Sequence, residues 1–166
     1  MSIESIHVLS MNPHFMARLI QAFLGGYGEA CSIQIVSLSL PILYHNQAKE
    51  KLLTAKNTSR LETLYTGKVL LNSGESISAR TKVAGFEERY RILLPYVKQA
   101  IIVGCNENLI MLNKDLQLCP LKILNHKDVS LKKSVSQLIR SAYYLGTVFR
   151  KATPEQLSHI LEVNLT

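Results

Sequence analysis

The sequence of 166 residues has no tryptophan and only three cysteines, and it lacks the features of a secreted or metal-binding protein. The cysteines, Cys31, Cys105 and Cys119, lie far apart and form no CxxC pair. An odd number of cysteines without ligand spacing supports neither a disulfide framework nor a zinc site. The first ten residues, MSIESIHVLS, show no basic region followed by a long apolar run. We therefore expect no signal peptide and a reducing, cytoplasmic environment.

Catalytic motifs are also missing from the sequence. None of the five histidines stands in HExxH or in an i, i+4 pair, and no GxSxG occurs. The GGYG stretch at 25–28 fits neither GxGxxG nor a P-loop, so it predicts no phosphate site. The charged run Glu87, Glu88, Arg89 and Arg91 could be catalytic, but a solvated helix face or an ion-pairing partner surface is the more common arrangement. We predict a protein that is not an enzyme and holds no cofactor and no metal, with an unrecognised enzyme as a third hypothesis.

No apolar run is long enough to cross a membrane. The most apolar segment, 31–44, has 14 residues and contains Ser32, Gln34, Ser37 and Ser39, which makes it too short and too polar for a bilayer. Alternating Ile33 and Ile35 hint at a strand, but Pro41 cannot donate to a central ladder. We therefore expect a buried helix that is kinked or broken near Pro41.

Hydrophobic residues make up 47% of the chain, enough for a folded core, and their spacing predicts mostly helices. Asn12-Pro13 is a helix start and Gly25-Gly26 its end. We expect short helices at 47–55 and 59–66, a connector with a buried Val-Leu-Leu at 67–74, and a long helical segment at 76–103 that Pro95 divides or kinks. Leu19, Phe23, Leu40 and Leu43 should be buried together.

After residue 106 the apolar period changes from helical to alternating. Residues 107–121 alternate around Asn113-Lys114-Asp115, which predicts a β-hairpin. A helix that leads into a hairpin is the end of a winged helix, with its helix–turn–helix drawn from 76–105 and its wing from 108–121. Residues 134–151 form the clearest amphipathic helix, and Thr153-Pro154-Glu155-Gln156 is a capping box that opens a last helix to about Val163.

The predicted fold is therefore mainly α with a small β-hairpin, an α+β fold. We expect one domain over 1–166, with a helical half at 1–74 and a winged-helix-like half at 75–166. No internal repeat and no low-complexity tract interrupts it.

Positive charge is concentrated in the C-terminal part. Lysine and arginine number 19 against 12 acidic residues, a net charge of +7, and residues 122–151 contain seven bases against one acid, Asp128. Five of these bases flank or lie on the 134–151 helix: Lys132, Lys133, Arg140, Arg150 and Lys151. They could contact DNA phosphates without reading sequence, or an acidic partner surface, but a merely solvated helix face fits the same pattern about as well.

Several segments occur in an order that resembles a known family. They are NPHF at 12–15, LPILYH at 40–45, FEERYRILLPYVKQAIIVG at 86–104, the helix followed by a hairpin, and SAYYLGTVFRKATPEQLSHILEV at 141–163. Together they resemble the middle component of bacterial three-component ABC systems, a group that includes the Lamassu defence systems against phages and plasmids. Such proteins are encoded between an SMC-like ABC ATPase and a variable effector, often a nuclease.

The resemblance implies partners rather than chemistry. It implies an accessory subunit that bridges the ATPase and the effector, with DNA reached through the complex and no membrane. It also implies that 37–45 is a core element in which His45 caps a helix end, with a metal or catalytic role as the minor alternative. The competing hypothesis is a free winged-helix DNA-binding regulator. Against it, the expected recognition helix at 96–105 has Lys98 as its single base and Gln99, with nearby Asn106, as its amides.

Overall fold

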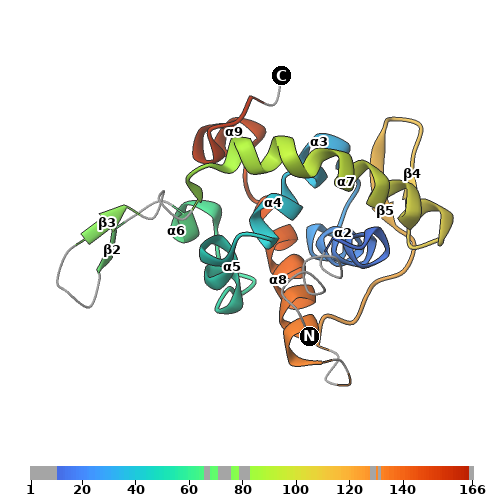
Figure 1. Ribbon diagram of the computed structural model, residues 1–166, viewed down its shortest axis with the longest axis horizontal. Helices are drawn as coiled ribbons and strands as arrows, with labels where there is room; N and C mark the ends of the chain where they lie inside the picture. Colours follow the sequence, from blue (N-terminus) through green and yellow to red (C-terminus); the bar gives the residue numbers. More distant parts are fainter. Residues whose placement is uncertain are drawn as a thin grey trace.

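Figure 1 shows the computed structural model of the protein, which describes residues 11–65, 68–70, 76–78, 83–127, 130 and 132–164. The helices are α2 (Pro13–Tyr27), α3 (Ile33–Ser37), α4 (Ser39–Leu43), α5 (Asn46–Leu53), α6 (Leu61–Tyr65), α7 (Phe86–Asn106), α8 (Lys133–Phe149) and α9 (Pro154–Leu161). The strands are β1 (Cys31–Ser32), β2 (Lys68–Leu70), β3 (Ser76–Ser78), β4 (Ile110–Leu112) and β5 (Gln117–Pro120). The predicted α+β class, mainly helical with a small hairpin, is confirmed.

The core is built around α2, which packs against both α7 and α8. The Asn12 side chain accepts a hydrogen bond from the His14 N–H at 2.9 Å and Pro13 occupies the first turn, as the sequence predicts. Every residue from Met16 to Leu24 except Arg18 is buried, so most of the surface of this part of the helix is covered. Leu19 and Phe23 lie in one core with Leu40 and Leu43, which confirms the predicted cluster.

The two glycines near the end of α2 do not terminate it. The helix continues to Tyr27 and ends at Gly28, whose φ of 78° is left-handed and whose N–H bonds the Leu24 carbonyl. A Cβ on Gly26 would lie 1.8 Å from the Tyr143 carbonyl oxygen of α8, and one on Gly146 would lie 2.0 Å from that of Phe23. These glycines therefore allow two helix backbones to touch where α2 and α8 cross.

The segment 31–44 begins with a two-residue strand, β1, which differs from the prediction, and continues as the predicted broken helix. Ser32 caps α3 by accepting from the Ile35 N–H at 3.3 Å, and the break before α4 falls at Leu38. Pro41 is the third residue of α4, where a helix does not need its N–H. His45 then caps α5, since its Nδ1 accepts from the Ala48 N–H at 3.4 Å, which is the role that the resemblance implied.

The middle of the chain differs from the sequence prediction. Residues 76–78 are a strand paired antiparallel with 68–70, not the start of a helix, and the predicted connector at 67–74 contains that partner strand. Residues 86–106 are one helix with Pro95 inside it, so the predicted division into two helices is wrong, and the alternative of a kink at Pro95 stays a prediction. Pro95 faces solvent, where water can bond the carbonyl that loses its helical partner. Within the described residues of 76–105, the expected helix–turn–helix is therefore not formed. The expected burial of Val-Leu-Leu lies outside the side chains that the structure describes.

The last third of the chain follows the prediction. Strands β4 and β5 form the hairpin, and β1 joins β5, so that the order is β1-β5-β4 in an antiparallel sheet. Helix α8 ends two residues earlier than expected, and α9 opens with the complete capping box of Thr153 and Gln156. In Figure 1, α9 lies near the first turns of α7 and the hairpin lies at the other end of that helix.

Candidate partner-binding surfaces

The five predicted basic residues do not form one continuous stripe. Lys151 donates hydrogen bonds to the carbonyls of Asn57 and Ser59, and Arg150 faces Glu29 with its Nε 3.8 Å from the carboxylate. Both lie at the C-terminal end of α8, where positive charge is favourable for the helix dipole. These two bases hold neighbouring segments in place.

The other three bases point into solvent. Lys132 and Lys133 lie at the N-terminal end of α8, and Arg140 lies two turns further along. Within the described part of the chain, none of the three has a carboxylate within salt-bridge distance. The five bases therefore form two groups. Lys132, Lys133 and Arg140 are called the unpaired group, and Arg150 and Lys151, at the other end of the helix, contact neighbouring segments.

An aromatic cluster adjoins this unpaired group, and the sequence analysis missed it. The His126 ring stacks on Tyr143 with centroids 3.7 Å apart and planes 7° from parallel, and the Arg140 guanidinium lies 5.6 Å from the centre of the Tyr144 ring. Burial and the charges of Lys127 and Arg140 lower the pKa of His126, which favours the neutral ring. The sequence shows the two tyrosines of the cluster, Tyr143 and Tyr144, next to each other on the predicted helix. The histidine, His126, comes from a preceding segment without regular structure, so the sequence gives no sign that it joins them.

The charged run at the start of α7 is a surface arrangement. Arg91 pairs with Glu87 one helical turn away at 3.1 Å, and both side chains are exposed. Arg89 turns back and donates to the carbonyls of Ala84 and Val83. The nearest hollow, about 400 Å³ between the start of α7 and the end of α9, is lined by residues 83–87 and 160–162, among which Glu87 and Glu162 are the charged ones.

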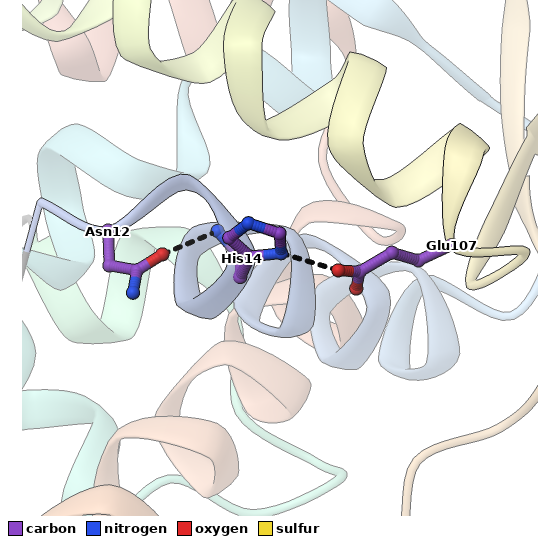
Figure 2. A network of polar contacts seen from close by, with 3 residues as sticks. All are labelled: Asn12, His14 and Glu107. Carbon is purple, nitrogen blue, oxygen red and sulfur yellow. Dashed lines mark hydrogen bonds and ion pairs between the residues drawn. The ribbon is translucent and has the colours of Figure 1, made fainter.

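Figure 2 shows a contact that joins the start of α2 to the end of α7. The side chain of His14 forms a hydrogen bond with Glu107, and Asn12 bonds the backbone of His14 in the same network. His14 is two-thirds exposed, so this pair fixes the helix ends rather than forming an enclosed site. It holds the end of α7 where the chain turns into β4.

The strongest surface feature is apolar. Among the described residues, every exposed large hydrophobic side chain lies between residues 92 and 123, on α7, the hairpin and the segment that follows. These residues, called the apolar surface below, are Ile92, Tyr96, Ile102, Met111, Leu112, Leu116, Leu121 and Ile123. Helical spacing alone could not reveal the α7 members, because α7 also carries a buried face, with Leu93 and Val97 among its residues.

Leu116 is an unusual residue within the apolar surface. It closes the hairpin loop Lys114-Asp115-Leu116 with φ of 56° and is 67% exposed. The loop is held by the Asn113 side chain, which accepts from the N–H groups of Asp115 and Gln117, each at 2.9 Å. A three-residue hairpin loop favours glycine at this left-handed position, so leucine there carries a conformational cost without gaining burial.

Two further observations concern the whole of the described chain. Within those residues, no group of three or more potential metal ligands is found, and no helix has the length and hydropathy needed to cross a bilayer. Burial raises the pKa of the Cys31 thiol to about 12, which keeps it protonated at neutral pH.

A mostly helical α+β protein that shows an apolar surface on one helix and hairpin has the features of a subunit that binds other proteins. The chain belongs to the family described as ABC-three component (ABC-3C) system Middle Component 3, whose model matches residues 2–165. No curated protein and no solved structure matches the chain. Membership in a multi-component system implies partner proteins, and the expected middle-component family is thereby shown.

Proposed function

We propose that this chain is a non-catalytic accessory subunit of a Lamassu-type defence complex. It links an SMC-like ABC ATPase to an effector, such as a nuclease, in the cytoplasm, and holds the effector inactive until foreign DNA is sensed. The family supports a place between partner proteins. The observation that carries the proposal is the apolar surface, because all the exposed large hydrophobic side chains of the described residues gather on α7, the hairpin and the adjoining segment.

The energetics favour an interface at this surface. Removing a leucine or isoleucine side chain from water stabilises an association by roughly 1.5–3 kcal/mol. Ile92 and Ile102 are 59% and 60% exposed and lie on the solvent side of one helix. Single exposed apolar residues are common on protein surfaces, whereas here eight of them lie within one stretch of the chain, between residues 92 and 123. Partner binding would bury the apolar side chains that remain exposed after the chain has folded.

Co-purification tests this function. The chain is expressed with the ATPase and effector encoded beside it, with the tag on the ATPase, and complex formation is measured by mass. We expect all three proteins in one species. Replacing Ile92 and Ile102 together by lysine should release the chain, because two charges then face the apolar partner surface. Replacing the exposed residues Gln34 and Gln47 by lysine adds the same charge elsewhere on the surface, and this variant should stay in the complex.

Loss of the complex can be distinguished from loss of the fold. Both lysine pairs lie on exposed positions, so both proteins should melt close to the wild type. Recovery of the tagged ATPase without the 166-residue chain, when all three proteins are expressed, would contradict the proposed function. Equal retention of both variants would place the contact elsewhere on the molecule.

A second candidate activity is non-specific DNA contact within the complex. Lys132, Lys133 and Arg140 favour it, because they are exposed and lack carboxylate partners among the described residues. Phosphate contacts of this kind position DNA without reading its sequence. The competing idea of a free winged-helix regulator is less well supported, since α7 replaces the two helices that it requires.

Salt dependence tests the DNA contact. Changing Lys132, Lys133 and Arg140 to glutamate should lower the DNA affinity of the assembled complex and flatten the log–log salt slope by about 0.9 for each phosphate that is no longer neutralised. Lys151 is left unchanged because it holds the carbonyls of Asn57 and Ser59. The matched control changes Lys49, Lys56 and Arg60 to glutamate. An unchanged slope in the first variant would show that the three bases are only solvated.

A further inference from the structure

Three aromatic rings meet where the segment after the hairpin reaches α8. The ring centroids of His126 and Tyr143 lie 3.7 Å apart, and the Tyr144 centroid lies 5.9 Å from the first and 5.6 Å from the second. Because these two distances are nearly equal, Tyr144 stands beside the stacked pair and not on top of it. Tyr143 covers one face of His126, so the other face has no aromatic partner among the described residues.

Positive charge gathers around this stack. Burial and the charges of Lys127 and Arg140 lower the pKa of His126, so both cations lie close enough to act on the ring. The described residues between 122 and 149 include no acidic side chain, and Asp128 lies outside the described residues. Like charges that are held together repel each other, and a bound polyanion would offset that repulsion.

The unpaired group continues from the stack along one side of α8. Four residues follow one another at spacings of four, three and four, which places them on one face of the helix: Lys133, Gln137, Arg140 and Tyr144. The first three of these side chains are exposed, and the Arg140 guanidinium lies 5.6 Å from the centre of the Tyr144 ring. At the rise of an α-helix, the row is about 16 Å long. A row with two cations therefore leads directly to the aromatic rings.

We propose that the free face of His126, backed by Tyr143, stacks on an unpaired nucleobase of single-stranded DNA, whose phosphates lie along Arg140 and the other members of the unpaired group. The inference rests on the proposed DNA contact and names the form of DNA that the chain holds. Proteins that bind single strands combine a basic surface for the backbone with aromatic side chains for the nucleobases. Inside a duplex each nucleobase is already stacked on both faces. An acidic protein surface would attract the cations but would make no use of the ring face.

An abasic strand separates the contribution of the nucleobases from that of the phosphates. The full wild-type chain is titrated with a labelled oligothymidine strand and with an abasic deoxyribose-phosphate strand of the same length, and binding is followed by fluorescence anisotropy. We expect the oligothymidine to bind at least about tenfold more tightly, because stacking on an aromatic side chain strengthens binding by this much or more for each nucleobase. His126→Ala should remove the preference, whereas His126→Phe, which keeps a ring, should retain it. Melting curves check that both variants stay folded.

Nuclear magnetic resonance on the wild-type chain gives a second measurement that does not depend on any variant. The ring protons of His126 should shift upfield when the oligothymidine strand is added, and should not do so with the abasic strand.

The results that would overturn the inference differ from those that would overturn the DNA contact. Equal affinity of the wild type for the two strands would overturn the base stacking and leave the contact with DNA phosphates standing. A preference that His126→Ala retains, or an unchanged His126 signal, would overturn the stacking as well. A wild-type chain that binds neither strand would overturn both, and the co-purification experiment would still decide the assembly with the ATPase.

Discussion

At the scale of single residues, Leu116 carries a backbone cost that packing does not offset, and His126 carries a cost when its ring is protonated. Leu116 occupies a left-handed backbone position while most of its side chain faces solvent. His126 stacks on Tyr143 beside Lys127 and Arg140, in surroundings that disfavour its protonated form. Costs of this kind gather at functional positions, and each can be measured.

Replacing Leu116 should separate stability from binding. Asparagine tolerates the left-handed region, so Leu116→Asn should stabilise the free chain by about 1 kcal/mol. It should also weaken association with the other components, because the hairpin tip then presents a polar side chain to the partner. Denaturant unfolding and co-purification measure the two effects. A variant that is more stable and binds equally well would show that Leu116 makes no partner contact.

The pH dependence of stability should report on His126. In the unfolded chain its pKa returns to the ordinary value near 6.5, whereas in the folded chain the pKa is lower. The unfolded state therefore binds more protons between the two values, and stability should fall as pH drops from about 7 through 6.5. His126→Phe keeps the stack on Tyr143 and should remove this part of the decline. Melting curves from pH 7.5 downward that fall equally in both proteins would contradict the assignment.

At the scale of helices and strands, the sequence predicts elements whose signals are local. The Asn12-Pro13 start, the capping box at 153–156 and the hairpin around Asn113 were all recognisable, because caps and turns depend on a few adjacent residues. Signals that depend on tertiary contacts were misread. Gly26 resembles a helix end but serves a helix crossing, and Pro95 resembles a helix break but sits on a solvent-facing turn.

The crossing of α2 and α8 gives a matched pair of substitutions. Gly26→Ala places a Cβ 1.8 Å from the Tyr143 carbonyl oxygen, which is backbone and cannot rotate away. It should destabilise the protein by about 3 kcal/mol. Gly25→Ala meets nothing closer than 3.9 Å, at Ile123, and should be neutral or stabilise by up to about 1 kcal/mol through helix propensity. Similar melting temperatures for the two variants would contradict the close helix contact.

The candidate sites were predictable only in part. The charge excess after residue 122 was visible in the sequence, but composition could not show that Lys151 and Arg150 bind neighbouring segments while Lys132 and Lys133 stay in solvent. The apolar surface was hidden, because an isoleucine such as Ile102 has the same sequence signal whether it faces the core or a partner. Only the packing of α7 on α2 decides which side is covered.

At the scale of the whole molecule, the two candidate surfaces differ in chemistry. The apolar surface on α7 and the hairpin suits a protein partner, and the unpaired bases at the start of α8 suit a polyanion. A subunit that holds a partner on one surface and approaches DNA with another would couple the two within a larger complex. The family supplies the setting of a multi-component ABC system, and the surfaces supply the proposed contacts.

Hydrogen–deuterium exchange on the assembled complex tests this account most directly. The chain would be measured alone and after co-expression with the ATPase and effector of the proposed complex, peptide by peptide. The account predicts that protection on assembly is strongest between residues 92 and 123, the range that holds the apolar surface. Protection confined to α5, α6 or α9, with 92–123 exchanging as in the free chain, would contradict it.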